Sequence, residues 1–324
     1  ILIAPYIVWA GFRSNAFGDT GSYQKAFREC ASSFGEIGNY LSSVTKDKGF
    51  YLLMALEKSI FGDSCRLFFI LLAAFQLLII VWMFRKYSED YWFSIFLFIA
   101  STDYISWTFN GIRQFTAVVI AYAATPFILK KKYIPSILLI LLASTMHQSV
   151  LLMIPIIFII QGKAWNKKTV LCILACLTAL LFVDHFTDIM DSMLAETQYR
   201  NVVSDYKSWN DDGTNPLRVL VYSIPMILSL IGLKYVQAED DPMINTAVGA
   251  SAIVCGLYVI SMVTSGIFLG RLPIYISLWS QCILLPWEIK HMFTEKSARL
   301  VKIIAICCYC VFFYFQMHFT WGIL

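Results

Sequence analysis

Charge is scarce in this sequence. Of its 324 residues, 14% are Asp, Glu, Lys or Arg, whereas 59% are hydrophobic. A soluble domain carries about 25% charged residues, so this chain has too little charge to cover a surface that faces water. Apolar runs long enough to cross a bilayer recur from end to end. Because backbone polar groups in lipid need internal partners, these runs are expected to be helices. The composition predicts an all-α, polytopic integral membrane protein of about ten or eleven transmembrane or re-entrant helices.

The motifs of several enzyme classes are also absent. The sequence has no P-loop, no HExxH or GxSxG motif and no DxD cluster beside a Rossmann pattern, which argues against an ATP-driven pump and a soluble nucleotide-sugar transferase. No CxxC pair with metal-ligand spacing occurs, and His147 has no second His or carboxylate one helical turn away. We therefore expect no metal and no other cofactor. The net charge of +4 is modest, so no nucleic-acid partner is expected either.

Long apolar stretches define the candidate spans. The first stretch is too short to cross a membrane and is expected to be the end of a first span. The stretches are Ile1–Phe12, Leu67–Phe84, Tyr91–Thr108, Gln114–Leu129, Thr169–Val183, Leu217–Leu233, Ile244–Val263, Leu272–Pro286 and Leu300–Phe319.

One more apolar stretch, from Tyr133 to Ile160, is interrupted by small polar residues around His147. It is longer than one span of roughly 20 residues and shorter than two, so it is either one tilted helix or two half-length helices that meet at His147. Basic clusters distinguish these alternatives. If the stretch dips into the membrane and returns, all of the clusters fall on one side, the cytoplasmic side, and we therefore predict a re-entrant pair. The clusters are Arg85 and Lys86; Lys130 to Lys132; Lys163, Lys167 and Lys168; Lys234; and Lys290, Lys296 and Arg299.

The remaining polar segments are then expected on the outer side of a single transmembrane domain, residues 1–324. They include an amphipathic segment, residues 13–66, with one or two short helices lying on the membrane surface. They also include an acidic loop, residues 184–216. Cys30 and Cys65 fall in the amphipathic segment, where a disulfide and two free thiols are both compatible with the sequence.

Arg113 is a candidate ligand for an anion. Asn110 is predicted to be the N-cap of the following span, which places Arg113 and Gln114 in its first turn. Free backbone N–H groups at a helix start favour anions, and a guanidinium adds a bidentate donor for phosphate. The alternative is an arginine that only extends its charge to the lipid headgroups.

His147 lies at the predicted break of the re-entrant pair. An ionisable side chain inside a membrane protein is a functional candidate by default. The alternative is a structural histidine bonded to a backbone carbonyl. Asp19 and Tyr23 lie in a Gly-Asp-Thr-Gly-Ser-Tyr segment, which also fits a plain turn before an amphipathic helix. Arg13 and Arg271 are each compatible with an interfacial position, but several arginines on one outer face favour a polyanionic headgroup as ligand.

The combination of these motifs resembles the EpsG-type family, which is grouped with the Wzy-type O-antigen and exopolysaccharide polymerases. The resemblance follows the order Arg13, Asp19 and Tyr23; Asn110, Arg113 and Gln114; His147; and then Arg271 with Tyr275. The acidic loop has no clear counterpart. The resemblance implies a GT-C-like membrane glycosyltransferase, metal-independent and inverting, that joins undecaprenyl-diphosphate-linked oligosaccharides at the outer face of the bacterial cytoplasmic membrane. Membrane lipid, a chain-length regulator and a flippase are the further partners that it implies.

The residues suggest roles within such a reaction. Arg113 would neutralise the departing diphosphate, and His147 or Asp19 would accept the proton of the acceptor hydroxyl. Arg13, Tyr23, Asn110, Gln114, Arg271 and Tyr275 would bind the substrate. Two other functions remain open: a flippase or transporter for lipid-linked glycans, and a membrane acyltransferase that modifies glycans. A transporter would favour paired repeats, and none is visible; an acyl donor would not call for several outward arginines.

Overall fold

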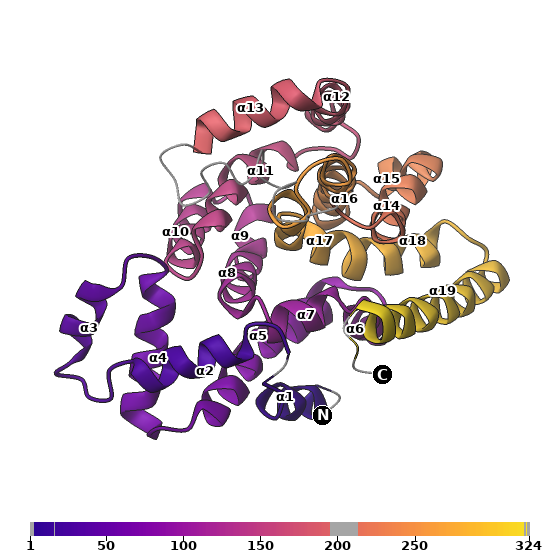
Figure 1. The fold of residues 1–324 in the computed structure, drawn as a ribbon. Coiled ribbons are helices and arrows are strands. Elements are labelled where there is room, and N and C mark those ends of the chain that lie inside the picture. Colours follow the sequence, from indigo (N-terminus) through magenta and orange to yellow (C-terminus); the bar gives the residue numbers. More distant parts are fainter. Residues whose placement is uncertain (1–2, 16, 195–212, 321, 323–324) are drawn as a thin grey trace. The chain divides into compact units, whose positions relative to one another are not determined.

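The computed structural model describes residues 3–15, 17–194, 213–320 and 322, which form helices and their connections without a β-strand (Figure 1). This confirms the all-α class. The chain divides into two compact units. The first unit contains residues 1–86, 95–154 and 305–324, and the second contains residues 87–94 and 155–304. The prediction of one transmembrane domain with outer segments stays a prediction.

The first unit begins with a short helix, α1, followed by three helices in the segment 13–66, where one or two were predicted. A long helix, α5, leads to the broken pair α6 and α7, and α8 continues through α9. Their bounds are α1 Ala4–Gly11, α2 Thr20–Glu29, α3 Ile37–Ser43, α4 Lys48–Phe61, α5 Cys65–Tyr87, α6 Tyr91–Ala100, α7 Asp103–Phe109, α8 Ile112–Ala123 and α9 Thr125–Leu129.

An aromatic core holds α2 and α4 against α5. Phe27 of α2 stacks on Phe68 of α5 with ring centroids 5.4 Å apart, and Phe50 of α4 meets Phe68 edge to face. The amphipathic pattern of α2 places Tyr23 in the same buried cluster. Lys58 of α4 donates to the last carbonyl groups of α2, including that of Arg28 at 2.7 Å, and so satisfies groups that a helix end leaves unpaired. Cys30 and Cys65 border this core as free thiols.

The apolar stretch around His147 forms two short helical segments, as predicted. α10 spans Tyr133–Ser144, and after the break the chain continues as a 3-10 turn, η1 Gln148–Leu152, and α11 Met153–Ile159. His147 itself is extended, with φ −160° and ψ 121°. Gln76 of α5 ties this unit together, because its buried amide donates to the Thr116 hydroxyl of α8 at 3.0 Å.

The second unit surrounds α16, a 20-residue helix that is almost entirely buried. α12, α14, α17 and the π-helical stretch η4 pack around it. The helices are α12 Lys167–Leu181, α13 Val183–Leu194, α14 Pro216–Ile231, α15 Leu233–Glu239, α16 Pro242–Ser261, η3 Leu269–Arg271, α17 Ile274–Trp279, η4 Ser280–Leu284, α18 Leu285–His291, α19 Glu295–Phe315 and η5 Gln316–Thr320. The last part of α19, with η5, belongs to the first unit.

Several of the basic clusters lie at one end of the second unit, as two contacts show. Lys163 pairs with Asp240 at 3.1 Å, just before α16 begins. Gly232, at the end of α14, lies directly against the side chain of Met292. At the other end of α16, the Ser261 hydroxyl donates to that of Thr214 at 2.7 Å. That all of the basic clusters share one side of the membrane stays a prediction.

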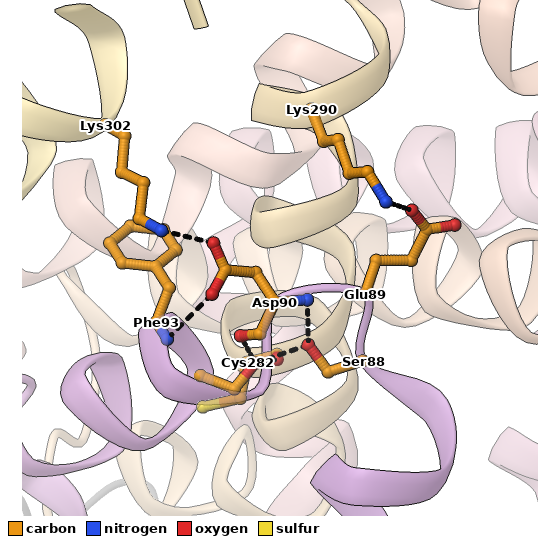
Figure 2. A network of polar contacts seen from close by, with 8 residues as sticks. Ser88, Glu89, Asp90, Phe93, Cys282, Lys290 and Lys302 are labelled. Atoms are coloured by element: carbon orange, nitrogen blue, oxygen red, sulfur yellow. Dashed lines mark hydrogen bonds and ion pairs between the residues drawn. The ribbon is translucent and has the colours of Figure 1, made fainter. Parts of the chain in front are cut away.

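A network of ion pairs and hydrogen bonds lies in the second unit, next to Met292 (Figure 2). Glu89 points to Lys290, with an oxygen–nitrogen distance of 2.6 Å. The same carboxylate oxygen lies 2.7 Å from His291 Nε2. Asp90 pairs with Lys302 of α19 and also accepts the backbone N–H of Phe93 at 3.2 Å. The turn after α5 is therefore fastened to the ends of α18 and α19 within the second unit.

Helix length and composition support a membrane protein. Within the described residues, α5, the α8–α9 helix, α16 and the helix 295–319 are long and apolar enough to span a membrane, and two bent pairs, α12–α13 and α14–α15, would raise the number from four to six. Leu171 and Leu181 of α12 remain 67% and 78% exposed, which suits lipid better than water. The larger number of ten or eleven transmembrane or re-entrant helices stays a prediction.

Several predicted boundaries were wrong. The stretch Tyr91–Thr108 is two helices rather than one span, because Thr102 adopts a positive φ of 59° between them. The stretch 272–286 lies in one continuous helical run, formed by α17, η4 and α18, which extends beyond the predicted end to His291. The acidic loop begins as a helix, α13, and residues 195–212 of that loop lie outside the described residues.

Candidate active site

The break at His147 lies beside the turn that precedes α4. The N–H of Gly49 donates to the carbonyl of Thr145 at 2.9 Å, and a Cβ atom at Gly49 would collide with the Thr145 hydroxyl. Only glycine allows this close approach. The contact holds the first turn of α4 against the end of α10, two residues from His147.

Asp47 occupies this turn in a left-handed conformation, with φ 55° and ψ 37°. Such a backbone is uncommon outside glycine, although aspartate tolerates it better than most residues. The turn directs the Asp47 side chain inward, where only 2% of it is exposed. Lys46 and Lys48 on either side are exposed.

Asp47, Arg113 and His147 form a cluster, which we call the Asp47 triad. The Asp47 Oδ2 lies 2.8 Å from Arg113 Nη1 and 3.5 Å from His147 Nδ1. The Arg113 and His147 side chains are 29% and 17% exposed, so the triad reaches the surface on their side. A carboxylate buried this deeply is stable only beside compensating charge, and Arg113 supplies it.

The second oxygen of the Asp47 carboxylate differs from the first in its contacts. Asp47 Oδ1 is buried and accepts no hydrogen bond from any described residue. Leaving a buried acceptor unpaired costs about 1–3 kcal/mol. The Asp47 carboxylate therefore keeps an unsatisfied acceptor next to its contacts with Arg113 and His147.

Tyr23, Asp19 and Asn110 border the triad. The Tyr23 hydroxyl lies within hydrogen-bonding reach of the Arg113 guanidinium, and burial raises the pKa of this phenol, which therefore stays protonated at neutral pH. Asn110 Oδ1 accepts the backbone N–H of Asp19 at 2.7 Å. The Asp19 side chain is exposed beside Tyr23. The residues predicted from three separate motifs therefore meet at one place.

The cap of α8 differs from the prediction. Gly111 is its N-cap, and Asn110 instead ends α7. The side chain of Asn110 accepts a hydrogen bond from Asp19 and does not cap α8, so Gly111 occupies the N-cap position. Arg113 still lies in the first turn of α8, as predicted, and Gln114 beside it is buried.

Arg13 lies at a different point of the first unit. Its side chain is 7% exposed, its guanidinium stacks 3.7 Å from the centre of the Phe69 ring, and its Nη1 donates to the carbonyl of Thr108 at 3.3 Å. Tyr23 is near enough to interact electrostatically with both Arg13 and Arg113.

Arg271 and Tyr275 belong to the second unit. Arg271 is exposed at the end of η3, and Tyr275 is buried in α17. Gly270 packs against Thr214 and Ser261, so Arg271 lies at the end of α16 that is opposite the Lys163–Asp240 pair. Their role in substrate binding stays a prediction.

Asp47 is the member of the site that sequence analysis missed. It stands between two lysines before a glycine, a pattern typical of a solvated turn. The local sequence contains no indication that the middle charge is buried while its neighbours are exposed.

An apolar cavity of about 680 Å³ opens beside the triad, between α4, α5, α8 and α10. Met146, next to His147 in the chain, is part of its wall. The other lining residues include Leu53, Leu56, Phe68, Leu72, Phe75, Ile120 and Leu142. Its dimensions and composition suit a hydrocarbon chain.

Glu57 is the exception in this apolar lining. Its carboxyl oxygens are buried and have no hydrogen-bond partner among the described residues. Burial raises the pKa of Glu57 to about 7. Since the unfolded value is about 4.3, the folded protein favours the neutral form, and stability is lost as the pH rises from about 4 to about 7.

We expect Glu57→Gln to stabilise the protein at pH 7.5 by about 1–3 kcal/mol and to have little effect at pH 4.5, because glutamine imitates the neutral acid. Thermal unfolding of the purified protein at the two pH values measures this difference. Glu29→Gln is the matched control, since the Glu29 side chain is 65% exposed on α2. An equal change at both pH values would contradict burial of the Glu57 carboxyl group.

Comparison with known proteins identifies a family for this chain. Neither a curated protein nor a solved structure matches this chain. The model of the EpsG family matches residues 1–321, which include every residue of the Asp47 triad and its surroundings. The chain therefore belongs to the EpsG family.

Proposed function

We propose that this protein is a polysaccharide polymerase that joins undecaprenyl-diphosphate-linked oligosaccharide repeat units at the outer face of the bacterial cytoplasmic membrane. Membership in the EpsG family indicates a polysaccharide polymerase-like membrane protein. The observation that supports the proposed reaction best is the Asp47 triad, in which a buried carboxylate holds a guanidinium and an imidazole together.

The proposed reaction needs a base and a cation. A hydroxyl oxygen of the acceptor glycan attacks the anomeric carbon of the donor glycan, and the bond from that carbon to the phosphate oxygen breaks. The bonding electrons leave with the lipid diphosphate, and the hydroxyl proton passes to a base of the protein. The diphosphate is already an activated leaving group, so the reaction requires no nucleotide. General-base catalysis contributes about 10²–10⁴-fold to such steps.

His147 is the base that we propose. Its Nδ1 lies 3.5 Å from Asp47 Oδ2, an electrostatic contact. We propose that the imidazole carries its proton on Nδ1, towards this carboxylate, which leaves Nε2 to accept one. The carboxylate also stabilises the imidazolium that forms during the reaction. Asp47 is then a positioning residue, in the manner of the third member of a catalytic triad. Asp19 is the alternative base, although it is exposed and has no comparable orienting partner among the described residues.

Arg113 is proposed to stabilise the departing diphosphate. Its guanidinium gives one N–H group to Asp47 and is partly exposed, so further donors can meet a phosphate oxygen. Guanidinium binds phosphate through a planar pair of donors. Tyr23, Asn110 and Gln114 are proposed to position the substrate around this group.

The apolar cavity would receive the isoprenoid chain of a lipid substrate. It adjoins the triad through Met146, so a chain in the cavity would leave its diphosphate near Arg113. Because the isoprenoid chain would enter the cavity from the hydrocarbon of the bilayer and not from water, the cavity would position the lipid and add little hydrophobic binding energy.

A reconstitution experiment tests the proposal. Purified protein in lipid nanodiscs is incubated with one defined undecaprenyl-diphosphate repeat unit, without nucleotide sugar and with a chelator of divalent cations. We expect a ladder of products that differ by one repeat unit, with inverted anomeric configuration in their NMR spectra. Absence of a ladder, together with movement of the intact lipid across liposomes, would contradict a polymerase and indicate a flippase.

A further inference from the structure

A second pocket, polar and of about 520 Å³, lies in the first unit where α1, α2 and the start of α5 meet. Three arginines line it: Arg13, Arg28 and Arg66. Asn15 and Gln24 add polar groups at its edge and bond to each other, with the Gln24 amide donating to Asn15 at 2.6 Å. We call this site the arginine pocket. The role proposed for the Asp47 triad does not use Arg28 or Arg66.

Arg13 forms the buried wall of the pocket. Its Nε and Nη2 are buried and have no hydrogen-bond partner among the described residues. Phe69 and Phe109 cover its guanidinium. Burial lowers the pKa of Arg13 to about 10, which leaves the group positive at neutral pH. A buried cation with unused donors is costly unless an anion pairs with it.

Arg28 and Arg66 are exposed at the mouth of the same pocket. Arg66 lies in the first turn of α5, 4.4 Å above the ring of Phe12, and the start of this long helix adds a partial positive charge. Asp63 is the acidic residue in the lining, and Lys58 pairs with it at 3.5 Å. The pocket therefore keeps an excess of positive charge.

The two arginine sites differ in how their charge is compensated. Arg113 pairs with a buried carboxylate at 2.8 Å, whereas no carboxylate in the described part of the chain lies within ion-pairing distance of Arg13. Planar guanidinium groups that converge on one cavity match the oxygens of a phosphate.

We propose that the arginine pocket is a second anion site, separate from the Asp47 triad, that binds a phosphate-bearing group. The proposed polymerase reaction brings two lipid-linked glycans together, and each carries a diphosphate. To that extent the inference rests on the proposed function: one diphosphate leaves beside Arg113, and the arginine pocket holds the other during transfer.

Two sources could supply the phosphate: the diphosphate of a lipid-linked substrate or the headgroup of an anionic phospholipid. The experiment measures binding of radiolabelled inorganic diphosphate and farnesyl diphosphate to the full-length protein in phosphatidylcholine nanodiscs. The test variant is Arg28→Gln with Arg66→Gln, because both side chains are exposed and their loss should leave the fold intact. Arg85→Gln is the matched control, since Arg85 is an exposed arginine in the last turn of α5.

We expect two binding sites for these ligands in the wild type and in Arg85→Gln. In the double variant one of the two sites should bind at least tenfold more weakly, while the site at Arg113 remains. Equal affinity of the double variant and the wild type would overturn the proposal. Nanodiscs that contain phosphatidylglycerol distinguish the sources. Competition by this lipid in the wild type, and not in the double variant, assigns the pocket to headgroups; tight farnesyl diphosphate binding without competition assigns it to the substrate.

Failure of this inference is distinguishable from failure of the proposed function. Diphosphate binding that depends on Arg28 and Arg66, in a protein that forms no ladder, would support the site and contradict the polymerase. If the wild type forms a ladder but the double variant binds diphosphate normally, the polymerase is supported and the second anion site is contradicted.

Discussion

Polymer formation should fall by about 10²–10⁴-fold when His147 is replaced by alanine, because the acceptor hydroxyl then loses its base. The ladder assay measures this loss. The aromatic core of α2, α4 and α5 does not include His147, so the variant should still fold and run as the wild type in size-exclusion chromatography. His185→Ala is the matched control, since His185 is exposed on α13 of the second unit.

The pH dependence of the wild type separates two roles for this histidine. A base must be neutral before it accepts a proton, so activity should rise with pH as the imidazole loses its charge. An imidazolium that only binds phosphate would produce the opposite trend. Asp47→Asn keeps the size of the side chain but removes the negative charge beside His147 and Arg113, so the maximal rate should fall. Long chains from His147→Ala would exclude this residue and leave Asp19 as the better candidate.

Arg113→Lys is expected to reduce polymer formation by about 10²-fold with normal expression. Lysine keeps the positive charge but loses the planar pair of donors that holds Asp47 and a phosphate at the same time. The Asp47–Arg113 contact is buried on the carboxylate side, so the substitution also loosens the partner of His147. Initial rates in the ladder assay, compared at low and saturating lipid substrate, measure the effect.

The control for this substitution is Arg85→Lys, the same change at an exposed position at the end of α5. It should leave the rate unchanged. A near-normal rate in Arg113→Lys would mean that this arginine serves only as a counter-charge for Asp47, a task that an ammonium group performs adequately.

Properties that depend on neighbouring residues could be predicted from the sequence. Apolar runs defined the all-helical membrane class, because a backbone in lipid must satisfy its hydrogen bonds within the helix. The polar interruption before Gln148 predicted two short helices that meet at His147, and α10 and η1 are separated there. Arg113 was placed in a first turn, and it lies in the first turn of α8. These features are local, and the sequence pattern is sufficient for them.

Partners that are distant in the chain were decided by tertiary structure alone. Asp47 and Arg113 are 66 positions apart, and they meet because the Gly49–Thr145 contact and the aromatic core bring the start of α4 against α8 and α10. The burial of Glu57 and Arg13 was not predicted either, since both residues belong to the segment 13–66, which was expected to lie on the membrane surface. Burial depends on which helix faces pack together, and a charge enters such an interface only where another element supplies a partner or leaves a pocket for one. The sequence alone determined the helices and the membrane class, whereas the packing of α2, α4, α5 and α8 determined the candidate active site.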